Sequence, residues 1–412
     1  MYSKSWVMKS NYKALGQYIQ PVDERNTALE SLPLMGLSVS KVFFPTIANL
    51  VGTDMKTYKI VYKNQFTYIA DTSRRGEKIA IALNENFDKM LVSQAYTPFE
   101  VKDNNELHPE YLMMWFRRPE FDRYARFKSH GSAREIFDWE EMCNTLLPIP
   151  SITKQREIVK EYNIIQNRIT LNQQLIQKLE ETAQAIYKQW FVDFEFPNES
   201  GKPYKSNGGT MVFNAELEVE IPKGWEYRSI KEFAQKIRSG GTPSRDEISY
   251  WNSRDIPWLK TGEIANKVLV ASEEYISTLG MKNSSAKLLP INTVLIAMYG
   301  EGKTKGQSGY LRFEATVNQA CCAISCVDET RSSYLYYFLR LNQARIAGLA
   351  NGGAQPNLSK DLIENIKVLQ PADDILKRHP FVKIIDQCEN IEKENIKLTE
   401  LTSILLSKLA TI

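Results

Sequence analysis

A long, uninterrupted apolar repeat constrains the fold of this chain most. Between Ser151 and Phe196 there is no Pro or Gly, and seam residues recur at alternating steps of four and three. This spacing is the heptad seam of a long helix that packs on a partner helix. At a rise of about 1.5 Å per residue, such a helix is roughly 50–60 Å long. The seam residues are Ile158, Tyr162, Ile165, Ile169, Asn172, Ile176, Leu179, Ala183, Ile186 and Trp190.

The last part of the chain offers the partner helix. The same alternation of steps returns there, again with an Asn on the seam. A buried Asn at a seam position costs stability but fixes the register of the two helices. Asn172 and Asn395 are therefore predicted to set how the helices align. The second seam consists of Ile384, Cys388, Ile391, Asn395, Leu398, Thr402, Leu405 and Leu409.

The segments that lead into the two helices also match each other, at a nearly constant spacing. Gly131–Arg134 corresponds to Gly352–Gln355. Further pairs are Tyr111/Tyr334, Leu112/Leu335, Arg117/Arg340, Phe137/Leu358, Met142/Ile363 and Pro150/Pro371. Half of the chain has thus been duplicated. Because a folded domain lies between the helices, an antiparallel arrangement is the simplest, with one domain at each end of the pair.

We therefore predict a mixed α/β fold with a pseudo-two-fold internal repeat. Two globular domains are separated by a pair of long antiparallel coiled-coil helices. Residues 1–150 form the first domain and 151–197 the first long helix; residues 198–371 form a linker and the second domain, and 372–412 the second long helix. Gly, Asn, Ser, Lys and Pro dominate residues 198–209, which predicts a flexible linker or a surface loop. Single helices are expected at His108–Phe127 and at Ser332–Leu341.

Composition narrows the class of protein. An apolar content of 43% and a charged content of 25% are ordinary for a globular protein. The net charge of +3 argues against a histone-like, non-specific binder of nucleic acid. The five Cys suggest no disulfide framework, and no stretch has the apolar length of a signal peptide or a membrane span. These features predict a cytoplasmic protein.

Motifs of catalysis are missing from the sequence. No Pro-Pro dipeptide exists, so the Asn/Asp-Pro-Pro-aromatic loop of amino-methyltransferases is absent. Ala297–Thr304 ends in Gly-Lys-Thr but lacks the first Gly of a phosphate-binding loop, which favours a basic loop between strands. Cys321, Cys322 and Cys326 lie in an apolar run, typical of a core strand and not of a metal site. We expect no catalysis, no metal and no cofactor in this chain.

Recognition of DNA remains as the best interpretation. Two similar domains held apart by a stiff helical pair suit a duplex, whose repeat along its axis is regular. Base edges are read by Arg, Lys, Asn and Gln, and phosphates are bound by Lys, Arg, Ser, Thr and backbone amides. Loops of this composition occur in both halves. The candidate DNA-binding residues are Arg74, Arg75, Lys78, Lys128 and Arg134, and then Ser239, Gly240, Thr242, Ser244, Arg245, Lys303, Lys305 and Gln307.

Several segments resemble one known family over the whole chain. They are Lys188–Pro197, Ser239–Ser244, Tyr250-Trp251, Ile256–Trp258 and Thr316–Ala320. With the paired Pro150 and Pro371, they are similar to the specificity subunit of type I restriction–modification enzymes. The first domain shows no counterpart of the Gly-Gly-Thr-Pro-Ser loop, as expected where the two domains read different half-sites.

The resemblance implies partners and chemistry outside this chain. Two target recognition domains would bind a bipartite DNA site. Two modification subunits would carry S-adenosylmethionine and methylate adenine, and restriction subunits would use ATP and Mg²⁺. The exposed faces of the long helices would dock these partners. Candidate docking residues are Trp190, Phe191, Phe194 and Phe196, for which packing against the adjacent domain is the alternative.

Two other functions fit the same sequence. The chain could be the recognition subunit of a system in which one fused partner both cleaves and methylates. It could also be a coiled-coil scaffold that holds two protein-binding domains and does not touch DNA. The bases that are read depend on side-chain placement beyond what a sequence shows.

Overall fold

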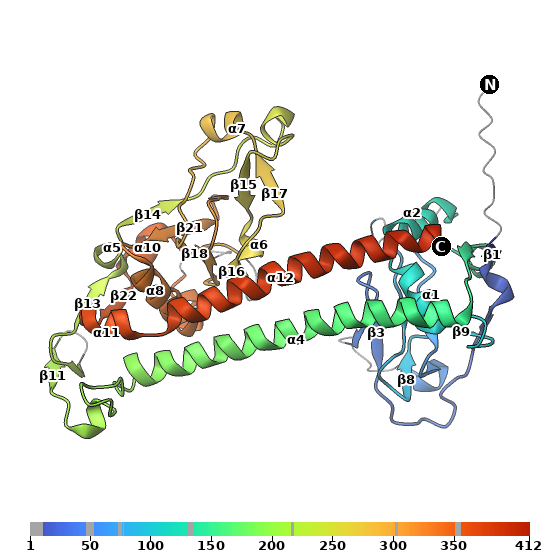
Figure 1. Cartoon of the computed structure of the whole chain (residues 1–412), viewed down its shortest axis with the longest axis horizontal. Helices are drawn as coiled ribbons and strands as arrows, with labels where there is room; N and C mark the ends of the chain where they lie inside the picture. Colours follow the sequence, from blue (N-terminus) through green and yellow to red (C-terminus); the bar gives the residue numbers. More distant parts are fainter. Residues whose placement is uncertain are drawn as a thin grey trace. The chain divides into compact units, whose positions relative to one another are not determined.

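The structure is a computed structural model in which residues 11–46, 53–72, 76, 78–130, 135–215, 218–300, 304–350 and 356–412 are described. The chain forms two compact units. Unit 1 contains the residues up to Ile169 together with Leu398–Ile412, and unit 2 contains Thr170–Lys397. In each unit a lobe of strands and short helices packs on part of the two long helices (Figure 1). Each unit is thus built from segments that are far apart in the sequence.

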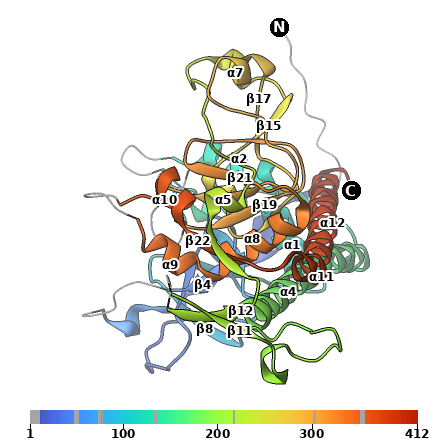
Figure 2. The ribbon, with the colours of Figure 1, turned by 90° about the vertical axis from the view of Figure 1, so that its left-hand side faces the viewer.

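Both long helices predicted from the apolar repeat are present. α4 spans Ile152–Phe191 and α12 spans Phe381–Lys408, and the two lie side by side (Figures 1 and 2). Every predicted seam residue is buried or half-buried. In unit 2 the seam asparagines meet directly, because Asn172 Nδ2 donates to Asn395 Oδ1 at 2.9 Å. In unit 1, Gln166 donates to Thr402 at 3.0 Å. The helices therefore run antiparallel, as predicted.

The first long helix is shorter than predicted. It ends at Phe191 and does not continue to Pro197. Phe194 adopts a left-handed φ of 62°, and the N–H of Glu195 donates to the carbonyl of Gln189 at 2.8 Å. The chain therefore turns back on the last turn of α4, and the aromatic residues that follow leave the helix.

The second long helix is also shorter than predicted. The region from residue 372 is interrupted, because α11 covers Asp373–Arg378 and α12 begins only at Phe381. Pro380 has no N–H and disfavours helical backbone in the residue before it, His379, whose φ and ψ are −66° and 149°. A short 3-10 helix, η5 (Leu409–Thr411), follows α12.

Unit 1 is organised around a four-stranded antiparallel sheet with the order β2-β9-β6-β7. Its strands are β2 (Ile19–Pro21), β9 (Thr97–Val101), β6 (Phe66–Tyr68) and β7 (Ile81–Leu83). Three two-stranded pairs accompany it: β1 (Tyr12–Ala14) with β10 (Leu146–Pro148), β3 (Met35–Leu37) with β4 (Phe43–Pro45), and β5 (Lys59–Tyr62) with β8 (Lys89–Val92). Its short helices are η1 (Leu15–Gln17), η2 (Met55–Thr57), α1 (Pro109–Phe116), α2 (Pro119–Lys128) and α3 (Trp139–Cys143).

Two features of unit 1 differ from a simple reading of the sequence. The single helix predicted over His108–Phe127 is two helices, since Pro119 starts a new one at its first position. The core also takes in the end of the chain, where Leu406 and Leu409 are buried with Tyr162 of α4. The fold of unit 1 therefore depends on residues from both ends of the sequence.

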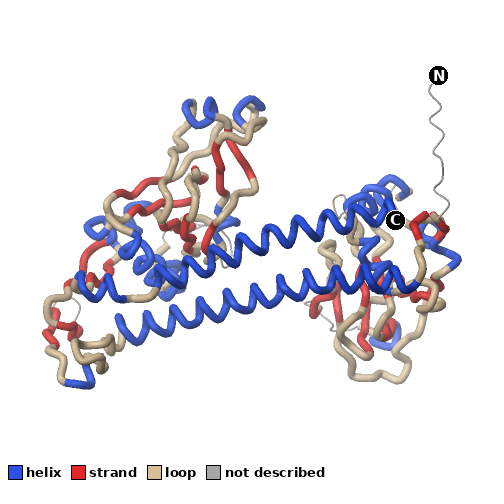
Figure 3. Tube along the Cα trace, in the orientation of Figure 1, coloured by secondary structure: helices blue, strands red, loops and turns tan. Residues whose placement is uncertain are grey.

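Unit 2 contains a five-stranded sheet with the order β14-β21-β18-β19-β16 and a three-stranded sheet with the order β17-β15-β20. The first comprises β14 (Lys236–Ser239), β21 (Cys321–Ser325), β18 (Val294–Ala297), β19 (Ser308–Leu311) and β16 (Val268–Leu269), and the second β17 (Glu274–Ile276), β15 (Ile256–Leu259) and β20 (Thr316–Val317). Two pairs complete the strands: β11 (Met211–Asn214) with β12 (Val219–Pro222), and β13 (Glu226–Ser229) with β22 (Lys367–Gln370). The remaining helices are η3 (Lys205–Asn207), α5 (Ile230–Phe233), η4 (Ile248–Tyr250), α6 (Thr261–Ile264), α7 (Thr278–Lys282), α8 (Glu329–Leu341), α9 (Gln343–Ala347) and α10 (Lys360–Asn365), as Figure 3 shows.

The internal repeat appears in matching strands and matching hydrogen bonds. The order β2-β9-β6-β7 of unit 1 corresponds to β14-β21-β18-β19 of unit 2. Tyr111 donates to the carbonyl of Pro148 at 3.0 Å, and its partner in the repeat, Tyr334, donates to the carbonyl of Leu369 at 2.6 Å. The predicted duplication is therefore confirmed at the level of single contacts. The four matching strands of each unit are called the frame below.

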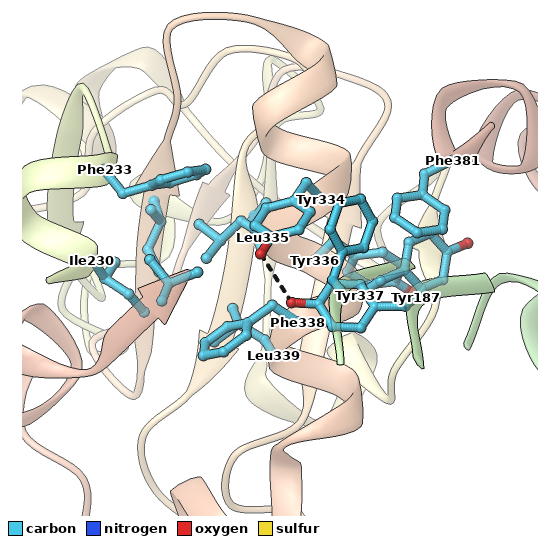
Figure 4. Packing of buried hydrophobic residues seen from close by; sticks show 14 of the residues in the cluster. Tyr187, Ile230, Phe233, Tyr334, Leu335, Tyr336, Tyr337, Phe338, Leu339 and Phe381 are labelled. Carbon is cyan, nitrogen blue, oxygen red and sulfur yellow. Dashed lines mark hydrogen bonds between the residues drawn. The ribbon is translucent and has the colours of Figure 1, made fainter. Parts of the chain in front are cut away.

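In unit 2, tyrosines of α8 join the frame to the long helices. Figure 4 shows Tyr187 of α4 beside Tyr334 and Tyr337 of α8 and Phe381 of α12. The hydroxyl of Tyr187 donates to that of Tyr334 at 3.2 Å. The guanidinium of Arg340 forms a buried ion pair with the carboxylate of Glu180. Apolar packing and one buried charge pair thus hold α8 on α4.

Candidate nucleic-acid interface

Three loops of unit 2 meet at one end of its five-stranded sheet. The N–H of Gly240, just after β14, donates to the carbonyl of Cys321 at 3.0 Å. The N–H of Met298, just after β18, donates to the carbonyl of Ala320 at 2.8 Å. The loop after β14, the loop between β18 and β19, and the segment before β21 are therefore neighbours. The described candidate residues of the second half lie in these loops, except Ser239, which is the last residue of β14.

The glycines of the Gly-Gly-Thr-Pro-Ser loop are required by close backbone contacts. A Cβ on Gly240 would lie 2.1 Å from the carbonyl oxygen of Asn318, and one on Gly241 would lie 2.4 Å from the backbone nitrogen of Ala286. The carbonyl of Gly241 accepts a hydrogen bond from the indole of buried Trp258 at 2.9 Å. Gly240 is therefore a residue that positions the loop, and its predicted role in binding DNA can only be through its backbone.

The side chains that follow these glycines are held by partners. The Thr242 hydroxyl is hydrogen-bonded to the Gln319 side chain. The guanidinium of Arg245 lies 3.5 Å from the ring centroid of Trp251 and pairs with the carboxylate of Glu274 at 2.6 Å. Arg245 remains half exposed, but this stacking and pairing restrict its movement. It can meet a ligand only in a fixed orientation.

The equivalent edge of unit 1 brings together the candidate segments of the first half. The hydroxyl of Thr72, in the loop between β6 and β7, donates to that of Ser129, just after α2, at 2.8 Å. The N–H of Phe137 donates to the carbonyl of Ala70 at 2.9 Å, as the N–H of Leu358 does to Met298 at 3.0 Å in unit 2. Two loops, one from a hairpin and one after a helix, therefore meet in the same way in both units.

The candidate side chains differ in how they lie at these edges. Lys78 is exposed, whereas Lys128 pairs with Glu141 at 3.3 Å. The ammonium group of Lys305 contacts the carbonyl of Pro356, so it joins the hairpin loop to the loop after α9. Ser239 and Ser244 are exposed, and Gln307 is half-buried. Arg74, Arg75, Arg134 and Lys303 lie outside the described residues. The binding roles of all these residues stay predictions.

Neighbouring polar residues that the sequence interpretation did not select also lie at this edge in unit 2. Asn318 Oδ1 accepts from the hydroxyl of Thr261, at the start of α6, at 3.0 Å. Gln319 faces Thr242 from the segment before β21. The segment Thr316–Ala320 resembled the family, but only the strand pairing shows that it adjoins the Gly-Gly loop.

The aromatic cluster after α4 is a packing element, which corrects its proposed docking role. Phe191, Phe194 and Phe196 are buried, and Trp190 is half-buried against the same core. The ring of Phe196 stacks on Trp225 with centroids 5.0 Å apart. The three phenylalanines belong to the core of unit 2 and are not free to contact another protein, whereas Trp190 keeps part of its surface exposed and its docking role stays a prediction. Packing, the alternative considered for them, is what the structure has.

Residues 198–209, predicted as a flexible linker or surface loop, make a defined surface turn. Asn198 Oδ1 accepts from the N–H groups of Ser200 and Lys202, each at 3.0 Å. The ring of Tyr204 stacks on Phe196 with centroids 4.5 Å apart. The polar composition indicated the loop, but the loop is anchored by the stacking of its own Tyr204 on Phe196, which precedes it.

A cleft of about 550 Å³ in unit 2 lies beside α6, β16 and α12. Its charged lining residues are Lys260, Glu263, Lys267, Glu273 and Glu392. Burial raises the pKa of the Glu392 carboxyl, and nearby Lys267 lowers it. Because the lining carries more carboxylates than ammonium groups, the cleft does not favour a phosphate backbone.

The described residues contain no group of three or more His, Cys, Asp or Glu side chains that could hold a metal ion. Cys321 and Cys322 are fully buried in β21, as predicted for core residues, and burial raises the pKa of each thiol to about 12. No helix in the described part of the chain is long and apolar enough to cross a membrane.

Known proteins match this chain along its length. The family model "Type I restriction modification DNA specificity domain" matches residues 13–181 and 222–403. The MjaIX specificity subunit of Methanocaldococcus jannaschii is 26% identical over 80% of this chain and 73% of its own. The HindI specificity subunit of Haemophilus influenzae is 23% identical over 88% and 89%. The crystal structure of an S subunit from M. genitalium covers 98% of this chain and 97% of its own, at a TM-score of 0.55 and 15% identity. The chain belongs to the family of type I restriction–modification DNA specificity proteins.

Proposed function

We propose that this chain is the DNA-reading subunit of a type I restriction–modification complex, with one half of a bipartite target bound by each unit. One observation carries the proposal: in each unit, a hairpin loop and the loop after a helix meet at the corresponding end of that unit's own sheet. A duplex with two half-sites needs two readers of this kind. The polar and basic composition of these loops suits phosphate and base contacts.

The partners and cofactors of this function lie outside the chain. We propose that two modification subunits bring S-adenosylmethionine for adenine methylation and that restriction subunits bring ATP and Mg²⁺. In this proposal the chain itself performs no catalysis and works in the cytoplasm, where the DNA and these partners are. Its own task is to bind the target and to present it to the methyltransferase.

Exposed apolar side chains on the long helices support docking of these subunits there. On α4, Leu171 and Leu175 lie one turn apart and are 58% and 50% exposed. On α12, Leu401 and Ile404 are 51% and 50% exposed. Leu and Ile at this spacing form an apolar stripe that a partner helix can cover. We propose these residues for docking in place of the buried aromatic cluster.

Selection of sites from a random duplex pool tests the function directly. The full chain, reconstituted with a modification subunit, is expected to enrich two short fixed runs of bases separated by a spacer of constant length. Binding should weaken steeply as salt rises, because phosphate contacts release counterions. Absence of any enriched sequence, or binding that does not respond to salt, would contradict the proposal and favour a protein scaffold.

A matched pair of lysine variants in unit 1 tests the placement of the interface. Lys78→Ala is expected to lower the salt slope of binding by about one phosphate contact. Lys89→Ala is the control, since its ammonium group pairs with Glu30 at 3.1 Å on β8, a strand outside the four-stranded sheet. Equal effects of the two changes would argue against the loop between β6 and β7 as a contact surface.

A further inference from the structure

A buried polar contact in unit 1 joins three elements at the base of the loop between β6 and β7. Lys41, in the turn between β3 and β4, has a left-handed φ of 63° and reaches the carboxylate of Asp122 on α2 at 2.9 Å. Its ammonium group also donates to the carbonyl of Phe116, the last residue of α1. Asp122 Oδ1 accepts the N–H of Ile79, at the end of the loop, at 3.2 Å.

Unit 2 has a contact of the same form, built from different residues. Asn266, between α6 and β16, has a left-handed φ of 56°. Its Nδ2 donates to the side chain of Gln343 at the start of α9 at 2.7 Å. Its Oδ1 accepts the N–H of Ser308, the first residue of β19, at 2.8 Å. The loop between β18 and β19 therefore ends at this contact.

The two contacts occupy similar places in the two units, although the strand residues that they hold differ by two positions. Ile79 lies two residues before β7 and Ser308 is the first residue of β19, and the N–H of each points away from the other strand of its hairpin. In each unit the residue with positive φ comes from a segment inserted between two strands of the matching sheets: Lys41 lies between β2 and β6 in the chain, and Asn266 between β14 and β18. In each unit the third partner is the helix that precedes a Gly-containing loop, α2 or α9.

We infer that Lys41–Asp122 and Asn266–Gln343 are positioning residues that couple each inserted segment to the DNA-binding loops of its unit. The inference rests on the proposed function. An inserted segment and a hairpin loop can read adjacent bases only if the distance between them is fixed. One polar side chain that bonds both the strand and the helix fixes that distance more narrowly than apolar contacts, because hydrogen bonds are directional.

The chemistry of the unit 1 contact supports a role beyond stability. The side chains of Lys41 and Asp122 are 6% and 12% exposed, and burial lowers the pKa of Lys41. Replacing a buried ion pair by apolar residues of similar size is often neutral or stabilising. Lys41 and Asp122 therefore contribute defined geometry, more than stability, at the base of the loop between β6 and β7.

Variants of Asn266 test the inference in unit 2. Asn266→Gly keeps the left-handed backbone free of strain and removes both side-chain hydrogen bonds. Asn266→Asp keeps the acceptor for Ser308 and should restore discrimination. Asn292→Gly is the matched control, because Asn292 also has a positive φ of 65°, and its side chain bonds Arg312 at the other end of the hairpin.

The readout is site selection from a random duplex pool by the full chain with its modification subunit. For Asn266→Gly we expect discrimination against single-base changes, ordinarily about ten- to a hundredfold, to fall about tenfold in one half-site only. The other half-site should be unchanged, and Asn292→Gly should select the wild-type site. Unchanged discrimination in both halves, or an equal loss in both, would overturn the inference. If the wild-type chain enriched no site, the proposed function itself would fail.

A double variant separates positioning from stability in unit 1. Lys41→Met with Asp122→Leu removes both charges and leaves the N–H of Ile79 without its acceptor. Loss of the ion pair itself is often neutral or stabilising, so the urea midpoint should fall only by the effect of the unpaired Ile79 N–H. The half-site that Asn266→Gly leaves intact should lose about tenfold in discrimination. A stable double variant that selects the wild-type site in both halves would refute a positioning role for this pair.

Discussion

The buried imidazole of His379 should make the stability of unit 2 depend on pH. Its side chain lies between α11 and α12 and is almost fully buried. Nε2 lies 3.2 Å from the carbonyl of Thr330, and Nδ1 accepts the N–H of Phe381 at 3.4 Å. A neutral ring with its proton on Nε2 satisfies both contacts. Protonation of Nδ1 would point its N–H at the N–H of Phe381, so that two donors face each other. It would also place a positive charge at the start of a long helix, where the helix dipole opposes it.

Burial lowers the pKa of His379 to about 4 from an ordinary value of about 6.5. The unfolded chain therefore takes up a proton before the folded chain does. The free energy of unfolding is therefore unaffected above about pH 6.5 and decreases progressively as the pH falls to about 4. Since each tenfold difference in proton affinity is about 1.4 kcal/mol, the whole effect is about 3 kcal/mol, of which about 2 kcal/mol is lost by pH 5.

His379→Gln isolates this contribution. The Gln amide can donate to Thr330 and accept from Phe381, much as buried Gln155 does in the first repeat, where its Oε1 accepts the N–H of His108 at 2.8 Å. Urea unfolding at pH 8 and pH 5 should show the wild type losing about 2 kcal/mol more than the variant. His130→Gln, which removes a ring that is 71% exposed, is the control for loss of a histidine. Equal pH dependence of wild type and His379→Gln would refute this reasoning.

Three further predictions concern the frame. Arg340→Met should destabilise unit 2 by about 3–5 kcal/mol in urea unfolding, because burial raises the pKa of Glu180 and its charge then lacks a partner; adding Glu180→Leu should recover most of the loss. Gly240→Ala should cost about 1–3 kcal/mol through the clash with the carbonyl of Asn318, whereas Gly262→Ala, with open space at its Cβ, should cost nothing; thermal unfolding distinguishes them. Deleting the chain from residue 405 should raise hydrogen exchange in the sheet of unit 1 and leave that of unit 2 unchanged, since among the described residues this segment packs in the core of unit 1.

The sequence predicted the shared frame well because the frame depends on periodic and repeated features. Seam spacing revealed α4 and α12, and the two seam asparagines that were predicted to fix register do bond each other. Matching pairs such as Tyr111 and Tyr334 revealed the duplication, and their hydrogen bonds correspond. The break between α11 and α12 was missed because the second long helix was placed from residue 372, although its seam begins only at Ile384, after Pro380.

The candidate site was predicted only in part, because its geometry comes from contacts between segments distant in sequence. The composition of the sequence indicated the basic loops, but it did not show that Arg245 stacks on Trp251. It could not separate the structural role of Gly240 from a role in binding. Lys41 and Asn266 gave no signal at all, since each is a single polar residue in an inserted segment. Left-handed backbone and partners far along the chain identify them only in three dimensions.

The two units share a frame but differ in what they insert into it. In unit 2, β15 pairs with β20 in parallel and also with β17, which forms a separate three-stranded sheet. In unit 1, β5 pairs with β8 in antiparallel fashion. Residues on a shared frame can place two readers alike, but base contacts depend on the inserted side chains. Two identical half-sites would require inserts of the same fold, so the selected DNA site should be asymmetric, with unlike base runs on the two sides of its spacer.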